Sequence, residues 1–286
     1  MSNPEPVLSP PEHLKYRRPM QLGGFLRQAW RARSLTLTLT ERELRARYKQ
    51  ALLGAAWAFA TPLGYVVVFS VFFDRAARIE TFGVSYPVFS YAALIPWGFF
   101  SQTVARGALS VVDNITLLNK VACPRETFVA SATSTALFDM LVSATAFPIV
   151  VLIAGEDFYL ATFTLVPVIA VQFAFALGLA LLLSSILVYV RDVRHLLPLV
   201  TQLLMFATPV VWGLEAARQR TSEGIIRLYA LLNPMSTVCE SFRRALAFGK
   251  QPEWDLLGLS AISALSLLAG GYWLFKKLET GFADVA

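Results

Sequence analysis

The chain has 286 residues, of which 56% are hydrophobic and only 15% are charged. Soluble domains average about 45–50% apolar and about 25% charged residues, so this composition excludes an ordinary soluble protein. Burial in lipid explains the shortage of charge, since a charged side chain near the bilayer centre costs roughly 2.5–3.5 kcal/mol or more. The net charge of +6 lies entirely in the first 50 residues, because the remainder carries equal numbers of basic and acidic residues. A basic segment beside an apolar one indicates retention on the cytoplasmic side of a membrane rather than nucleic-acid binding.

The N-terminal region divides into a tail and a basic segment. Residues 1–23 are rich in proline and are expected to be flexible. Residues 24–50 are predicted to form a cytoplasmic amphipathic interface region, because Thr40-Glu-Arg-Glu43 fits a capping box that would start a helix near Glu41. That helix would lie along the membrane surface and present the interface residues Arg42, Arg45, Arg47 and Tyr48. Just upstream, Ser34–Thr40 alternates leucine and threonine, a strand signal that we expect a helix to override.

Residues 51–286 are predicted to form a transmembrane domain, because a span needs about 20 mostly apolar residues and several such runs follow. The predicted spans cover about 51–73, 87–111, 127–154, 160–190, 196–214 and 256–275. Between the last two, Leu228–Cys239 is apolar but too short to cross, and Asn233-Pro234 breaks it. It is predicted to be an external re-entrant segment. The expected fold is an all-α polytopic membrane protein with six transmembrane helices and an N-terminal amphipathic interface helix.

The placement of lysine and arginine predicts the orientation. The N-terminal block, the loops at 113–126 and 191–195, and Lys276-Lys277 all fall on one side of the predicted spans. The positive-inside rule makes this side cytoplasmic, so both termini of this multi-pass chain are expected in the cytoplasm. Residues 215–255 would lie outside, where acidic neighbours nearly balance their basic residues.

No motif for chemistry stands out in the sequence. It contains no G-x-x-x-x-G-K-[ST] phosphate loop, so a transporter driven by ATP would need its motor on another chain. His13 and His195 stand alone, and no catalytic, cofactor or metal site is predicted. The 113–126 loop is a compact turn whose short helix would end at Pro124 and could dock in a groove of a soluble partner. A plain solvated connector is the alternative.

Several segments in order resemble the polysaccharide-export ABC permeases. RELRARYKQALLGAAWAFATPL, at residues 42–63, is similar to the opening of these membrane subunits. Residues 120–126 resemble the family's coupling loop, which implies contacts to the ATPase through Lys120, Pro124, Arg125 and Glu126. Further similar segments are Arg191-Asp192, Pro209–Trp212, Asn233-Pro234 with Glu240 and Arg243, and Phe282–Asp284.

The resemblance implies a function and a set of partners. The chain would be the channel-forming permease subunit of an ABC transporter, and not an enzyme. It would form a homodimer with two copies of a nucleotide-binding subunit, which would hold ATP and Mg while this chain holds no cofactor. The cargo would be a lipid-linked polysaccharide of O-antigen, teichoic acid, capsule or galactan type, exported across the bacterial inner membrane for cell envelope biogenesis. The alternatives are a drug or lipid ABC exporter, and a membrane-embedded enzyme of lipid-linked sugar metabolism.

Aromatic residues of the first two spans are candidates for lining a channel. Tyr65, Phe69, Phe72 and Phe73 recur at helical spacing on one face of the first span. Sugar rings have apolar C–H faces that pack on aromatic rings, so these four residues are proposed as channel lining together with Trp57 and Trp97. Ordinary helix packing or an aromatic belt at the membrane interface is the alternative.

One carboxylate interrupts the third span. Asp139 lies about 18 Å into it at 1.5 Å per residue. A carboxylate at that depth needs a partner, water or a proton. Arg106, near the cytoplasmic end of the second span, is predicted to form an intramembrane ion pair with it. A channel-facing Asp139 is the alternative.

Overall fold

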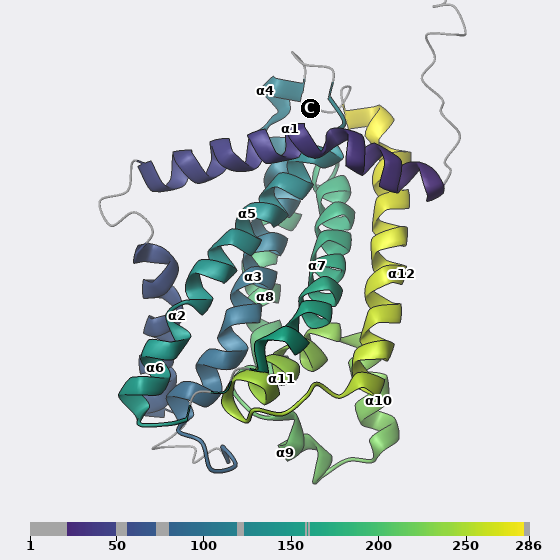
Figure 1. The fold of residues 1–286 in the computed structure, drawn as a ribbon. Coiled ribbons are helices and arrows are strands. Elements are labelled where there is room, and N and C mark those ends of the chain that lie inside the picture. The colour runs from purple at the N-terminus through teal and green to yellow at the C-terminus, as the bar shows by residue number, and fades with distance from the viewer. Residues whose placement is uncertain are drawn as a thin grey trace, which may run out of the picture.

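The computed structural model describes residues 22–49, 56–72, 80–118, 123–157, 159 and 161–282, and every regular element in these ranges is a helix. Four long helices run side by side as a bundle (Figure 1), and they are α3 (Tyr86–Asp113), α5 (Glu126–Ala144), α7 (Leu165–Leu187) and α12 (Trp254–Leu278). Shorter helices flank them, namely α2 (Ala56–Phe69), α6 (Phe147–Ala154) and α8 (Val193–Ala207). Short turns of helix complete this set at α4 (Ile115–Leu118), η3 (Ala161–Thr164) and η4 (Glu279–Gly281).

The length and composition of the helices confirm a polytopic membrane protein. Within the described residues, Glu126–Ala154, Leu165–Leu187 and Trp254–Leu278 are long and apolar enough to cross a membrane. The first of these combines α5 and α6 across a bend at Thr145. Helix α3 has 28 residues but a more polar middle, while α2 and α8 have 14 and 15 residues. The count of six spans therefore stays a prediction.

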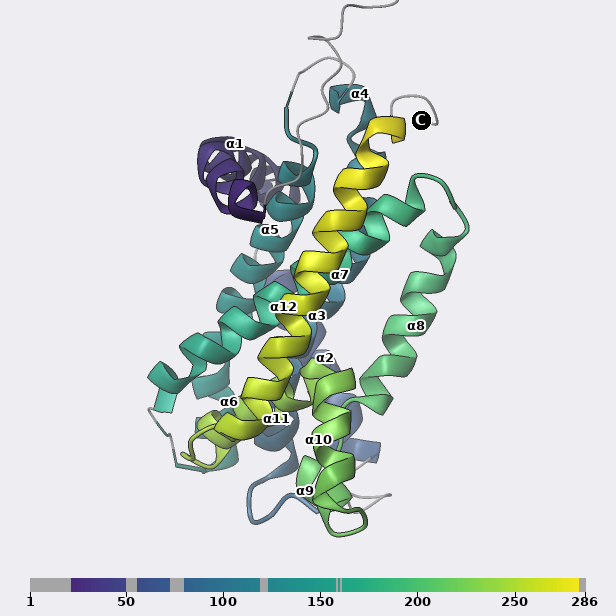
Figure 2. The same cartoon turned by 90° about the vertical axis from the view of Figure 1, so that its right-hand side faces the viewer.

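Helix α1 (Leu22–Lys49) lies across one end of the bundle, nearly at right angles to it (Figures 1 and 2). The predicted helix start near Glu41 is wrong, because the chain is already helical at Leu22. The Thr40 hydroxyl does not cap a helix; it donates to the carbonyl of Thr36 one turn earlier, at 2.8 Å. Thr36 and Thr38 make the same bond to their own preceding turn, so the leucine–threonine alternation sits within a helix, as expected.

Close backbone contact joins α7 to α12. A side chain at Gly178 of α7 would place its Cβ 2.6 Å from the backbone nitrogen of Leu268 in α12. Gly271 of α12 faces the Gly178 carbonyl in the same way. Small residues let membrane helices approach until their backbones touch, where van der Waals packing replaces the hydrophobic effect. This pair of helices forms one wall of the bundle.

The opposite end of the bundle is built from α9 (Leu214–Arg218), α10 (Glu223–Leu232) and α11 (Pro234–Ala247) (Figure 1). Helix α10 ends before Asn233 and α11 begins after it, at the position where Asn233-Pro234 predicted a helix break. Helix α11 packs against α3, α7 and α12, and nearly all of its side chains are buried. The re-entrant path of this segment through lipid stays a prediction.

A fully buried arginine, Arg243, connects the segments at this end of the molecule. Arg243 of α11 donates to the carbonyls of Pro209 and Val210 at 2.9 and 3.0 Å, in the turn that follows α8. Its guanidinium also pairs with Glu240 at 2.6 Å and stacks over the Phe89 ring at 4.0 Å. Because Phe89 belongs to α3 and the two carbonyls belong to the turn after α8, Arg243 connects α11 to both of these segments.

Candidate functional site

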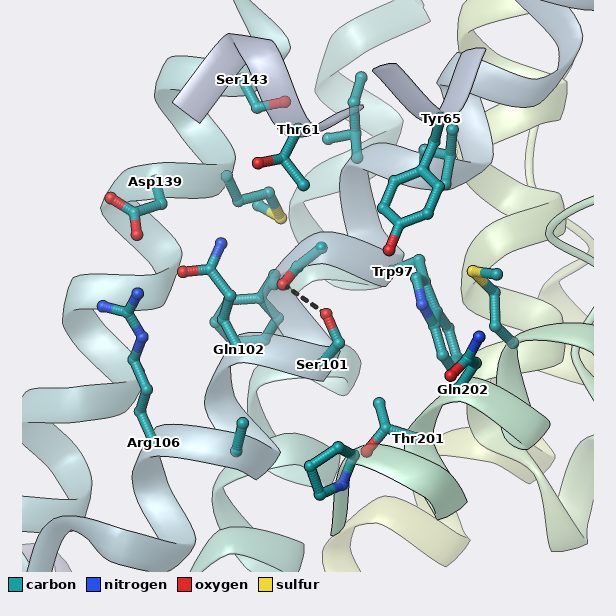
Figure 3. A pocket seen from close by; sticks show the side chains of 18 of the residues that line it. Thr61, Tyr65, Trp97, Ser101, Gln102, Arg106, Asp139, Ser143, Thr201 and Gln202 are labelled. Carbon is teal, nitrogen blue, oxygen red and sulfur yellow. Dashed lines mark hydrogen bonds between the residues drawn. The ribbon is translucent and has the colours of Figure 1, made fainter. Parts of the chain in front are cut away.

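A cavity of about 730 Å³ lies among α1, α2, α3, α5 and α8 (Figure 3). Apolar residues such as Leu94 and Met205 form part of its wall. The polar part of the wall is formed by Arg47, Tyr48, Thr61, Tyr65, Ser101, Gln102, Arg106, Asp139, Ser143, Thr201 and Gln202. Some of these groups already bond within the chain, as Ser101 does to the Gly98 carbonyl at 3.2 Å and Thr201 to the Leu197 carbonyl at 2.6 Å. The remaining polar groups of the wall can bind water or a polar ligand.

Helix α3 supplies the largest part of this wall. Its cavity face recurs at helical spacing, from Trp97 through Ser101 and Gln102 to Arg106. Pro96 lies within the helix, just before this face. The Pro96 carbonyl accepts a bond of 2.6 Å from the side chain of Gln172 in α7, which holds α3 in place from behind the cavity.

Asp139 is anchored from α1 and not from α3. Arg47 donates to one of its carboxylate oxygens and Tyr48 to the other. Asp139 therefore pairs with Arg47 and not with Arg106, so the predicted ion pair is wrong. The reason is that α1 crosses α5 at this level, and its side chains bond to both carboxylate oxygens. Arg106 projects into the same cavity from α3 (Figure 3).

The Tyr48 hydroxyl is suited to this donor role. Burial and, to a smaller extent, the hydrogen bond to Asp139 raise the pKa of Tyr48 to about 12. The phenol therefore stays protonated at any physiological pH and donates to the carboxylate.

The contact between α1 and α5 extends beyond Asp139. Glu43 accepts hydrogen bonds from Ser131 at 3.0 Å and Thr135 at 3.2 Å, both on α5. At the end of α3, Arg42 donates to the side chain of Asn114 at 2.8 Å. Of the predicted interface residues, Arg42, Arg47 and Tyr48 thus contact the bundle, whereas Arg45 is exposed and pairs with Glu41 on its own helix.

The aromatic candidates separate into three groups. Tyr65 and Trp97 line the cavity. Phe69 is buried behind Tyr65, with its ring centroid 5.6 Å away, and Phe72 is exposed and lies outside the described cavity wall. The placement of Phe73, like that of the Trp57 side chain, lies outside the part of the chain that the structure describes.

The predicted coupling loop is attached to the C-terminal end of the described chain. Arg125 donates to the carbonyl of Glu279 and lies 5.6 Å from the centre of the Phe282 ring. Lys276 bridges Glu126 at 2.8 Å and Glu279 at 2.9 Å. The Pro124 carbonyl accepts from the Thr127 amide at 3.1 Å, which begins α5. Lys120 lies outside the described residues.

Comparison with known proteins identifies the family of this chain. The model of the family described as ABC-2 type transporter matches residues 34–247, from α1 to the end of α11. The chain belongs to the ABC-2 type transporter family. The matched residues of this ABC-2 transporter chain include the whole wall of the cavity.

Named relatives cover nearly the full length of this ABC-2 transporter chain. The O-antigen export system permease protein RfbA of Myxococcus xanthus is 28% identical over 263 residues, covering 91% of this chain and 98% of its own length. A protein of the same name from Klebsiella pneumoniae is 23% identical over 252 residues, covering 88% of this chain and 94% of its own length. The polysialic acid transport protein KpsM of Escherichia coli is 26% identical over 243 residues, covering 83% of this chain and 91% of its own length.

Sequence reasoning missed the contribution of α8 to the cavity. Thr201 and Gln202 of this helix line the wall opposite α3 (Figure 3). The available signal was an adjacent polar pair inside an otherwise apolar run from Leu196 to Ala207. Polar residues inside a span face protein or water, so that pair pointed to a wet interior.

Proposed function

We propose that this ABC-2 transporter chain is the channel-forming permease subunit of an exporter of lipid-linked polysaccharide in the bacterial inner membrane. The observation that carries the proposal is the polar, partly aromatic cavity among α1, α2, α3, α5 and α8 of a chain with helices long and apolar enough to cross a membrane. Relatives that cover 91% and 83% of the chain are named as O-antigen export and polysialic acid transport proteins, which supports a polysaccharide as cargo.

The composition of the cavity wall suits a sugar polymer. Hydroxyl and amide side chains such as Ser101, Gln102 and Thr201 can exchange hydrogen bonds with sugar hydroxyls. Tyr65 and Trp97 offer aromatic faces on which the C–H faces of sugar rings can pack. Contacts of this kind hold a polymer weakly and independently of its sequence, which allows it to slide.

We infer a homodimer in which α8 contributes to the contact between the two copies. Helix α8 buries only Leu197 and Met205 within this chain. Its outward face carries exposed apolar side chains, namely Leu196, Leu199, Val200, Leu203 and Phe206. Since α8 also borders the cavity, two copies joined along this face would enclose a wider passage between them.

We infer that the end of the bundle marked by α1 and α4 (Figure 1) faces the cytoplasm, with both termini on that side and six spans between them. We infer that the predicted coupling loop acts at this end, where Arg125 donates to the Glu279 carbonyl of η4. Two copies of a separate ATPase, with ATP and Mg bound, would act on it there. This arrangement is supported by the basic residues of α1, which suit the cytoplasmic surface of a membrane.

Deletion of the gene tests the proposal. Cells without this chain are expected to lose a surface polysaccharide and to accumulate the same polymer, still attached to its lipid, in the cytoplasm. Expression of the wild-type chain restores export, and an ATPase co-purifies with it. A surface polysaccharide profile unchanged by the deletion would contradict the proposal.

A further inference from the structure

We propose that Arg106 of α3 is a binding site for an oxyanion of the substrate, a phosphate or a carboxylate. The inference rests on the proposed function for the nature of the ligand. It goes beyond that function by assigning one side chain and one chemical class of group to the cavity.

The charges in the cavity do not balance. Its described wall carries two arginines, Arg47 and Arg106, and a single carboxylate, Asp139. Both oxygens of that carboxylate accept hydrogen bonds from α1, one from Arg47 and the other from Tyr48. One positive charge is therefore left over, and it belongs to Arg106.

Arg106 is placed to bind a ligand. Its side chain is exposed, it lines the cavity, and it makes no ion pair with any other residue in the described part of the chain. A guanidinium stays charged at every physiological pH, so burial cannot neutralise it by removing a proton. In a cavity walled by apolar helices, such a charge is stabilised by an anion that enters the cavity.

The neighbours of Arg106 add neutral donors. Gln102 lies one turn earlier on α3 and lines the same cavity, while Thr201 and Gln202 line the opposite wall from α8 (Figure 3). The guanidinium presents N–H groups in a fixed fork that fits two oxygens of one phosphate or carboxylate. The Gln102 amide can donate to an oxygen that remains. No acidic side chain other than the occupied Asp139 lies in the described wall to compete.

The position along α3 also matches an amphipathic substrate. Arg106 lies about two turns before the end of α3 at Asp113, the end that we propose to be cytoplasmic. Trp97 lies roughly 13 Å further along the helix axis at 1.5 Å per residue. A glycan carried on a lipid phosphate could thus place its anionic group on Arg106 and its sugars on the aromatic side of the cavity.

Equilibrium binding to the purified full-length chain in lipid nanodiscs tests the site. The probes are farnesyl diphosphate, farnesol as its uncharged counterpart, and oligogalacturonate as an acidic sugar without phosphate. The variants are Arg106→Gln, Arg106→Lys and the matched control Arg194→Gln, which removes an exposed charge outside the cavity wall. Wild type is expected to bind farnesyl diphosphate more tightly than farnesol, and Arg106→Gln to lose about tenfold or more of that affinity.

The binding affinities of the variants show whether Arg106 binds the anion. Arg106→Lys should keep part of the affinity, because a lysine retains the charge without the fork, and Arg194→Gln should bind as wild type does. A loss confined to oligogalacturonate assigns the oxyanion to the sugar, and a loss confined to farnesyl diphosphate assigns it to the lipid. Equal binding of both anions by wild type and Arg106→Gln would overturn the site, as would wild type that prefers neither anion to farnesol.

Failure of the site is separable from failure of the proposed function. The same chains are expressed in parallel in the deletion strain, and surface polysaccharide is measured. Export restored by wild type together with unchanged anion binding rejects the Arg106 site alone. Absence of any export defect in the deletion strain rejects the proposed function, whatever the binding data show.

Discussion

At the scale of single residues, the need of Asp139 for a partner could be predicted from the sequence, but the identity of that partner could not. The need for a partner could be predicted, because a lone carboxylate inside an apolar run is too costly to leave unpaired. The partner itself could not, because Arg47 and Tyr48 precede Asp139 by about 90 residues and meet it only where α1 crosses α5. Arg106 was the nearest arginine by depth, but depth along a span does not give the rotation of a helix about its axis.

A double-mutant cycle tests this assignment. Asp139→Asn and Arg47→Gln remove two halves of one contact, so their effects on the free energy of unfolding should be clearly less than additive. Asp139→Asn alone is expected to cost up to about 3 kcal/mol, because it leaves Arg47 partly buried beside a neutral amide. The effects of Asp139→Asn and Arg106→Gln should add. Thermal unfolding of the purified protein gives the values, with the exposed Arg45→Gln as a near-neutral control; coupling to Arg106 instead of Arg47 would refute the assignment.

At the scale of helices, the presence of a helix could be predicted from the sequence, but the residues at which it begins and ends could not. Periodicity and basic residues predicted a helix in this region, but α1 begins at Leu22, and the Thr40 hydroxyl bonds to the preceding turn instead of capping a helix start. The break at Asn233 followed from Asn233-Pro234. The contact of α7 with α12 gave no sequence signal, because Gly178 and Gly271 are far apart in the chain and many other glycines contact nothing.

Two glycine substitutions with opposite expected signs test the α7–α12 contact. Gly178→Ala places a methyl group against the backbone of α12, and overpacking of this kind typically costs about 1–3 kcal/mol. Gly258→Ala, on α12 with open space around it, should instead stabilise by about 0.5–1 kcal/mol, as alanine does in a helix. Thermal unfolding distinguishes them; equal shifts would mean that α7 and α12 do not touch at Gly178.

Attachment of the predicted coupling loop to η4 gives a prediction about energy transfer. Lys276→Gln removes the bridge between Glu126 and Glu279 and should loosen the loop. Under the proposed function, export is expected to fall several-fold while the partner ATPase continues to hydrolyse ATP. Measuring ATP hydrolysis and export on the same preparations shows this uncoupling. Lys277→Gln, the exposed neighbouring lysine, serves as the matched control; equal effects of the two substitutions would refute a specific role for the bridge.

At the scale of the whole molecule, the sequence predicted the class of protein and not the shape of its interior. Composition excluded a soluble protein, and short motifs indicated a polysaccharide-export permease, which agrees with the family and its relatives. The cavity is assembled from five helices, so its wall follows from how they pack and not from any one segment. Of the six aromatic candidates, Tyr65 and Trp97 line the cavity. Phe69 is buried in the core and Phe72 is exposed on the outside, which the sequence alone does not show.

Substitution of Tyr65 tests whether the cavity conducts a glycan. Tyr65→Leu keeps an apolar side chain but removes the aromatic face, and should reduce export by up to about tenfold if each sugar contact is worth about 0.5–1.5 kcal/mol. Phe72→Leu, the same loss of an aromatic ring at an exposed position outside the described wall, should leave export unchanged. Surface polysaccharide in the complemented deletion strain is the measurement; equal export by the two variants would argue against a lining role for Tyr65.

The arginine at the far end of the bundle also constrains how the protein is made. Phe89, Pro209 and Val210 leave the ribosome well before Arg243, so the carbonyls at 209 and 210 have no guanidinium to bind until α11 emerges. Assembly of this end is therefore among the last events of biosynthesis. A polypeptide stopped before Asn233 would leave the carbonyls at 209 and 210 without their arginine and would be a target for quality control, even though every long apolar helix but α12 had already been made.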